Sequence, residues 1–122
     1  MPLPTKRPLT RLRDIAENSE AILEYTRGMD FESFLRNRLV RDASERCLAR
    51  ISEAAVKLGP VAEDLLPQHS WRDIRNFGNI LRHEYEDVLD DVTWAIITRH
   101  LPPLLLELEI FLARYPEDQE TL

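Results

Sequence analysis

The chain has 122 residues, of which 43% are hydrophobic and 31% are charged, and its formal net charge is −6. This composition fits one globular domain over residues 1–122, with a core between about 9 and 114, and no apolar run approaches the ~20 residues of a membrane span. The first residues contain no apolar stretch of signal-peptide length, so we expect a cytoplasmic protein.

The charge is unevenly distributed along the chain. Residues 1–50 carry 10 basic and 8 acidic side chains, whereas residues 51–122 carry 6 basic and 14 acidic ones. Because the second half of the chain is strongly acidic, broad binding to nucleic acid without sequence preference is not expected, although a small basic cleft is still possible. The single cysteine, Cys47, excludes an internal disulfide and lies on the apolar side of a helical pattern, where a packed thiol is more common than a reactive one.

The first half of the chain predicts two helices. The sequence favours an all-α fold, because it contains three glycines in all, no Asn-Gly or Asp-Gly turn and no sustained alternation of apolar and polar residues with period 2. We expect the first helix over about 9–27, with Gly28 as its C-cap. Asp30 is expected to cap one long second helix that ends before Gly59. Its inward residues are predicted from their spacing: Phe34, Leu35, Leu39, Ala43, Cys47, Ile51, Ala54 and Leu58.

The second half predicts three or four shorter helices. Pro60 and Pro67 delimit a short one, and Ser70 with Asp73 resembles a capping box, so the next should begin near Trp71. It should run to about residue 83 or 85 with four inward residues: Ile74, Phe77, Ile80 and Leu81.

After an acidic turn, a helix around residues 92–99 is expected to bury Trp94, Ile96 and Ile97. Leu101-Pro102-Pro103-Leu104 is expected to break the chain sharply before a last helix over 104–114, and the tail from Pro116 should be frayed. Together these patterns predict a single up-and-down bundle of about five to six helices.

The helix that begins at Trp71 carries an unusual set of polar residues. At helical spacing, Arg72, Asn76, Asn79 and His83 share one stripe, and Arg75, Asn79 and Arg82 form a second, overlapping one. This set is either a plain polar face or a site that holds a phosphate and moves a proton. A metal site is not indicated, because the three histidines show no ligand spacing, and no cofactor motif is present.

Gly78 is the other unusual residue of this helix. A glycine inside a helix costs about 1 kcal/mol relative to alanine, so its presence suggests that another helix, a partner subunit or a ligand approaches closely there.

These residues resemble a known family. Trp71-x-x-Ile74, Gly78-Asn79-x-Leu81-x-His83-x-Tyr85, Trp94 and Leu101-Pro102-Pro103-Leu104 resemble the HepT-like family of HEPN-fold proteins, over roughly residues 9–114. The resemblance implies the toxin of a toxin–antitoxin pair. Such a toxin is a metal-independent endoribonuclease without a cofactor, and it acts as a homodimer with RNA cut at the interface. It also implies an antitoxin partner, an MNT-type nucleotidyltransferase that attaches AMP to the toxin.

The family motif, Arg-Asn-x-Leu-x-His-x-Tyr, can be carried over position by position. Its Asn falls on Asn79, its His on His83, and its Tyr, where AMP is attached, on Tyr85. Its Arg falls on Gly78, so the positive charge would have to come from Arg75 or Arg82. His83 would transfer the proton and Asn79 would orient the phosphate.

Two other functions fit the same residues. The lost motif Arg favours a non-catalytic HEPN binding module that pairs with a nucleotidyltransferase or binds a nucleotide. A purely structural helical bundle is the third possibility.

Overall fold

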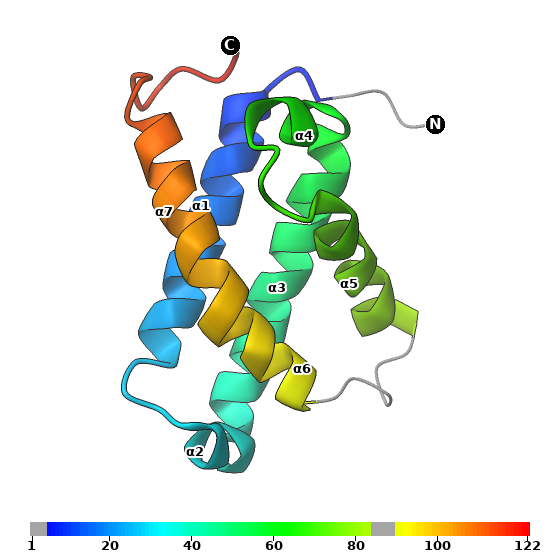
Figure 1. The fold of residues 1–122 in the computed structure, drawn as a ribbon, viewed down its shortest axis with the longest axis vertical. Helices are drawn as coiled ribbons and strands as arrows, with labels where there is room; N and C mark the ends of the chain where they lie inside the picture. Colours follow the sequence, from blue (N-terminus) through cyan, green and yellow to red (C-terminus); the bar gives the residue numbers. More distant parts are fainter. Residues whose placement is uncertain (1–4, 84–89) are drawn as a thin grey trace.

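The residues that the structure describes form helices, short connections and a non-helical C-terminal tail. A computed structural model describes residues 5–83 and 90–122, and for residues 82 and 83 the backbone alone. The elements in chain order are α1 (Pro8–Tyr25), α2 (Phe31–Arg36), α3 (Arg38–Leu58), α4 (Val61–Leu65), α5 (Trp71–His83), α6 (Asp90–Ala95), the π-helical segment η2 (Ile96–His100) and α7 (Leu101–Leu112) (Figure 1). The prediction of an all-α bundle is therefore confirmed, and none of the described helices is long and apolar enough to cross a membrane.

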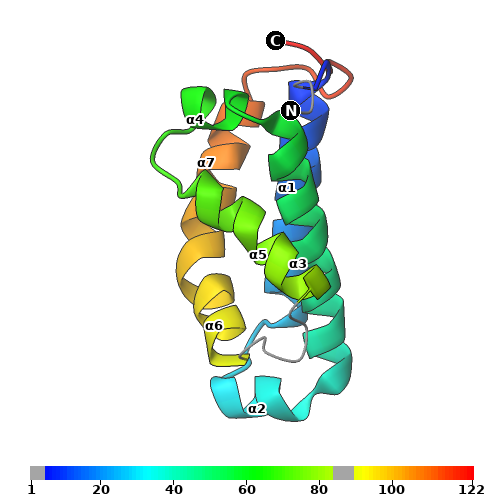
Figure 2. The same ribbon diagram turned by 90° about the vertical axis from the view of Figure 1, so that its right-hand side faces the viewer.

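One apolar core lies between the long helices. α1 packs along α3 and against α7, and α5 packs on α3 (Figures 1 and 2). Side chains at 3–4 spacing turn one face of each helix inward. They include Leu12, Ile15 and Ile22 of α1, Cys47, Ile51 and Leu58 of α3, and Leu104, Leu108 and Phe111 of α7. Cys47 is a packed thiol, as expected.

The long helix predicted after Asp30 is interrupted, which corrects the sequence-based expectation. Asn37 has φ −108° and ψ 89°, outside the helical region, and its side-chain oxygen accepts a hydrogen bond from the Val40 N–H at 3.0 Å. The capping side chain of an asparagine bonds the backbone at the start of a new helix, which favours a non-helical conformation of the asparagine itself. α2 therefore ends and α3 begins there. Asp30 does cap, but it caps the short α2. Leu35 and Leu39, predicted inward, are 37% and 79% exposed.

The sharp break predicted at the two prolines is also wrong. α6, η2 and α7 follow one another as a nearly continuous rod (Figure 1). Pro102 lies in the first turn of α7, where a backbone N–H has no partner within the helix, so proline removes no α-helical hydrogen bond. The wider π turn before it absorbs the change in hydrogen-bonding pattern.

The C-terminal tail, predicted to be frayed, is held against α1. The Arg13 guanidinium donates to the carbonyl oxygen of Pro116 at 2.8 Å and to that of Gln119, and the Leu9 N–H donates to the Glu120 carbonyl at 3.1 Å. Gly28 has the left-handed φ of 74° that favours glycine, but it lies in the turn after the cap residue Thr26.

Replacing two leucines tests the α2–α3 break. Leu39→Ala should change the free energy of unfolding by less than about 0.5 kcal/mol, because Leu39 is 79% exposed. Leu48→Ala should lower it by about 2–5 kcal/mol, because Leu48 is 4% exposed within the core. Urea unfolding of both variants measures the difference, and similar losses for the two would contradict the interruption at Asn37.

Candidate functional site

One face of α5 carries the polar stripe that the sequence predicts. Arg72, Asn76 and Asn79 are all exposed, and α5 ends at His83, one turn after Asn79. Of His83 and Arg82 the structure describes the backbone alone, and Tyr85 lies outside the described residues. The stripe is therefore an exposed surface of α5 that carries amide and guanidinium groups at helical spacing.

The opposite side of α5 is buried. Trp71 is 1% exposed, and its indole N–H donates to the Leu66 carbonyl at 2.7 Å, which fixes the start of α5 against α4. Ile74, Phe77 and Leu81 pack partly buried against the core, as predicted, whereas Ile80 is 37% exposed and was wrongly placed inward.

Gly78 faces α3, which identifies the close neighbour that a glycine inside a helix suggested. Gly78 is buried, and its N–H donates to the hydroxyl oxygen of Ser52 at 3.1 Å. The same hydroxyl donates to the Arg75 carbonyl at 2.9 Å. A single buried serine of α3 thus bonds two backbone groups of α5.

The Arg75 side chain also turns toward α3. Its Nε donates to the Ala55 carbonyl at 3.3 Å and its Nη2 to the Gly59 carbonyl at 2.9 Å. The rest of the guanidinium forms an ion pair with the Glu63 carboxylate, in which Nη1 lies 3.1 Å from one oxygen. Arg75 therefore joins α5 to the C-terminal end of α3, at two carbonyl groups that also accept hydrogen bonds from the backbone N–H groups of Gly59 and Ala62. Its donors point away from the exposed stripe.

This ion pair perturbs the Glu63 carboxyl group. The hydrogen bond from Arg75 lowers the pKa of Glu63 from its ordinary value of 4.5, with a further contribution from the Arg75 charge, while burial acts in the opposite direction.

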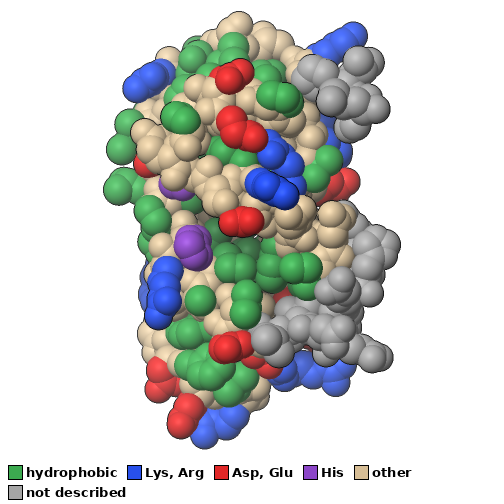
Figure 3. Space-filling model, turned by 45° about the vertical axis from the view of Figure 1, so that its right-hand side comes forward, with side chains coloured by type: hydrophobic (Ala, Val, Ile, Leu, Met, Phe, Trp, Pro, Cys, Tyr) green, Lys and Arg blue, Asp and Glu red, His purple; other side chains and the backbone are tan. Residues whose placement is uncertain are grey.

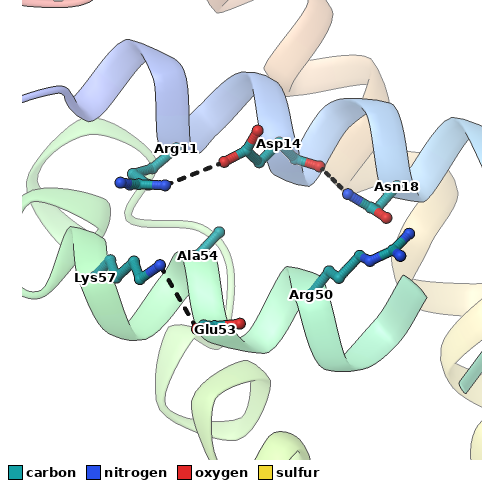
Figure 4. Close-up of a pocket in the computed structure, with 7 residues that line it drawn as sticks. All are labelled: Arg11, Asp14, Asn18, Arg50, Glu53, Ala54 and Lys57. Atoms are coloured by element: carbon teal, nitrogen blue, oxygen red, sulfur yellow. Dashed lines mark hydrogen bonds and ion pairs between the residues drawn. The ribbon is translucent and has the colours of Figure 1, made fainter. Parts of the chain in front are cut away.

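A separate polar groove of about 250 Å³ lies between α1 and α3 (Figure 4). Its charged side chains largely neutralise one another: Arg11 pairs with Asp14 at 3.5 Å, and Lys57 pairs with Glu53 at 3.6 Å. The helical register of α3 places these residues away from Ser52, so the groove is not part of the α5 site.

Comparison with known proteins places this helical bundle in a defined class. The family model described as "Ribonuclease HepT-like" matches residues 15–110. The chain belongs to the HepT-like ribonuclease family.

Particular relatives agree with this assignment. The chain is 34% identical over 93 residues to the "Probable ribonuclease HepT" of Thermococcus cleftensis, which covers 76% of this chain and 84% of the relative. It is 29% identical over 99 residues to the "Putative RNase MJ1380" of Methanocaldococcus jannaschii, which covers 81% of this chain and 91% of the relative. No solved structure matches the chain.

Sequence reasoning singled out α5 but missed the residues that support it. Ser52 and Glu63 were not recognised, because a serine among the inward residues of a helix and a glutamate in a short surface helix are both commonplace. The only signal was Gly78, whose missing side chain called for a close neighbour without naming it.

The lowered pKa of Glu63 predicts how the ion pair depends on pH. Because the folded-state pKa lies below the ordinary 4.5, the pair stabilises the fold above about pH 4.5 and this contribution is lost as pH falls through the folded-state pKa. Glu63→Gln should therefore lower the free energy of unfolding by up to about 1 kcal/mol at pH 7, a modest value because the Glu63 side chain is 50% exposed.

Urea unfolding at a series of pH values measures the difference, which should vanish in acid. The matched control is Glu53→Gln, which removes an exposed pair within α3 and should cost less than about 0.5 kcal/mol. A Glu63→Gln deficit that is unchanged in acid would contradict a role for the charged pair.

Proposed function

We propose that the chain is a metal-independent endoribonuclease, the toxin of a toxin–antitoxin pair. The observation that carries the proposal is the exposed Asn79, one helical turn before His83, in a chain that belongs to the HepT-like ribonuclease family. The relatives named as ribonucleases support RNA as the substrate.

The chemistry of RNA cleavage without a metal assigns roles to His83 and Asn79. A base removes the proton of the ribose 2′-hydroxyl, the 2′-oxygen attacks the phosphorus, and an acid protonates the departing 5′-oxygen, which leaves a 2′,3′-cyclic phosphate. We assign proton transfer to His83, because imidazole titrates near neutral pH. Asn79 orients the phosphate by donating from its amide.

The negative charge that develops on the phosphate needs a cation to stabilise it, and we assign this role to Arg82. Gly78 occupies the position of the motif Arg, and the Arg75 donors are engaged by the carbonyl groups of α3 and by Glu63. Arg82 directly precedes His83 in α5. Arg75, the other candidate from the sequence, acts in this proposal by supporting α5.

A homodimer would complete the site. Ile80 is 37% exposed beside the half-buried Phe77 on the apolar flank of α5, and hydrophobic side chains gather in the middle of the face drawn in Figure 3. A second copy related by two-fold symmetry would cover such a surface and bring a second motif into one cleft.

The partner in this proposal is an MNT-type nucleotidyltransferase that attaches AMP to the Tyr85 hydroxyl. The adenylyl group would place a bulky anion two residues after His83, where it would compete with the RNA phosphate. The alternative function is the non-catalytic binding module, which pairs with the same enzyme without cutting RNA, and the glycine at position 78 favours it.

Loss of the imidazole tests catalysis. His83→Ala should lower cleavage of total or transfer RNA in EDTA by ~10²-fold or more, the usual scale for a lost general base. His100→Ala removes an exposed histidine outside α5 and should cleave as the wild type does. Equal cleavage by the wild type and His83→Ala would refute the assignment, and an inactive, unmodified wild type would favour the binding module.

The proposed modification is tested by mass spectrometry after incubation with ATP and an MNT-type nucleotidyltransferase. The wild type should gain adenylyl groups and Tyr85→Phe should gain none, because the acceptor hydroxyl is missing. Tyr25→Phe, which removes an exposed tyrosine hydroxyl from α1, is the control and should be modified normally. Adenylylation of Tyr85→Phe would show that another residue is the acceptor.

A further inference from the structure

We propose that Ser52 is a positioning residue for the α5 site: its hydroxyl fixes the height and rotation of α5 on α3 and thereby places Asn79 and His83. This inference rests on the proposed ribonuclease function, although it concerns a residue outside the family motif and on a different helix.

The hydrogen bonds of Ser52 define one position of α5. The hydroxyl donates to the Arg75 carbonyl at 2.9 Å and accepts from the Gly78 N–H at 3.1 Å, and Ser52 is 1% exposed. A hydroxyl has one proton and two lone pairs, so this single group satisfies a donor and an acceptor on neighbouring turns of α5. Sliding or rotating α5 would break both bonds where water cannot replace them.

The Arg75 side chain extends the same contact along α3. Its guanidinium reaches the carbonyl groups of Ala55 and Gly59, so residue 75 is bonded to α3 at positions 52, 55 and 59. These positions are three, four and seven residues apart and lie on one side of the helix. The backbone and the side chain of one α5 residue are therefore both fixed to α3.

Gly78 permits this arrangement and links it to the site. A glycine adds no side chain to the buried contact with Ser52, and the next residue in α5 is Asn79. Because catalytic groups must be held to within a fraction of an ångström, a misplacement of about 1 Å costs ~10²-fold in rate. The turn fixed by Ser52 immediately precedes the turn that carries Asn79 and His83.

The chain offers a matched control for this test. Ser44 lies eight residues earlier in α3 and is 0% exposed, but its hydroxyl has no hydrogen-bond partner among the residues that the structure describes. Ser44→Ala and Ser52→Ala thus remove the same atom from the same helix at similar burial, and only Ser52→Ala releases α5.

The experiment measures RNA cleavage and backbone amide hydrogen exchange in the wild type and these variants. Ser52→Ala should lower kcat by about 10-fold or more with KM within about twofold, and should speed exchange of the amides of residues 79–83. Ser44→Ala should change neither. Ser52→Thr, which keeps the hydroxyl, should retain more activity than Ser52→Ala.

Three outcomes would overturn the inference. These are an unchanged kcat in Ser52→Ala, equal losses of kcat in the two alanine variants, or a Ser52→Thr variant no better than Ser52→Ala when both are folded. If the wild type cleaves no RNA, the proposed function fails by itself. The amide hydrogen exchange of residues 79–83 then still tests whether Ser52 fixes the position of α5. Equal exchange rates in Ser52→Ala and Ser44→Ala would overturn that role.

Discussion

The buried polar contact between α3 and α5 is the constraint on which the candidate site depends. The other long helices meet through apolar side chains, which tolerate small shifts because dispersion and burial are not directional. Hydrogen bonds from Ser52 and Arg75 are directional, and a buried group that loses its partner costs about 1–3 kcal/mol. α5 therefore has one favoured position on α3, whatever freedom the apolar packing leaves.

This contact explains why glycine is compatible with position 78. In this chain the residue is buried and its N–H is bonded to Ser52, so α3 occupies the space next to it. A positive charge for RNA chemistry then has to come from another residue, and Arg75, which lies nearest on this side of α5, is already bonded to α3 and α4. The glycine at position 78 and the engagement of Arg75 are two aspects of the same helix contact.

Two errors in the sequence-based fold, at Asn37 and at Pro102, share a cause. At Asn37 and at Pro102, the same residue type either ends a helix or begins one, depending on the backbone around it. Pro102 stands out in the sequence as an unusual point of the chain but Asn37 does not, and only the packed helices decide which choice buries more apolar surface. Phe34 reaches the core because α2 is separate from α3, and this leaves Leu39 in solvent.

The sequence by itself determined the all-α class, the approximate bounds of α1, α4 and α5, and the family resemblance, because helical periodicity, caps and the motif are local patterns. It also marked the Trp71 helix as the candidate site. Only the tertiary structure decided that Gly78 meets Ser52, that Arg75 serves the fold, and that the tail from Pro116 returns to α1. These facts join residues 26, 16 and more than 100 positions apart, and no local pattern encodes which distant groups will meet. The physical reason is that a polar side chain bonds whichever backbone group the packed helices bring within reach, and the tertiary packing alone decides which group that is.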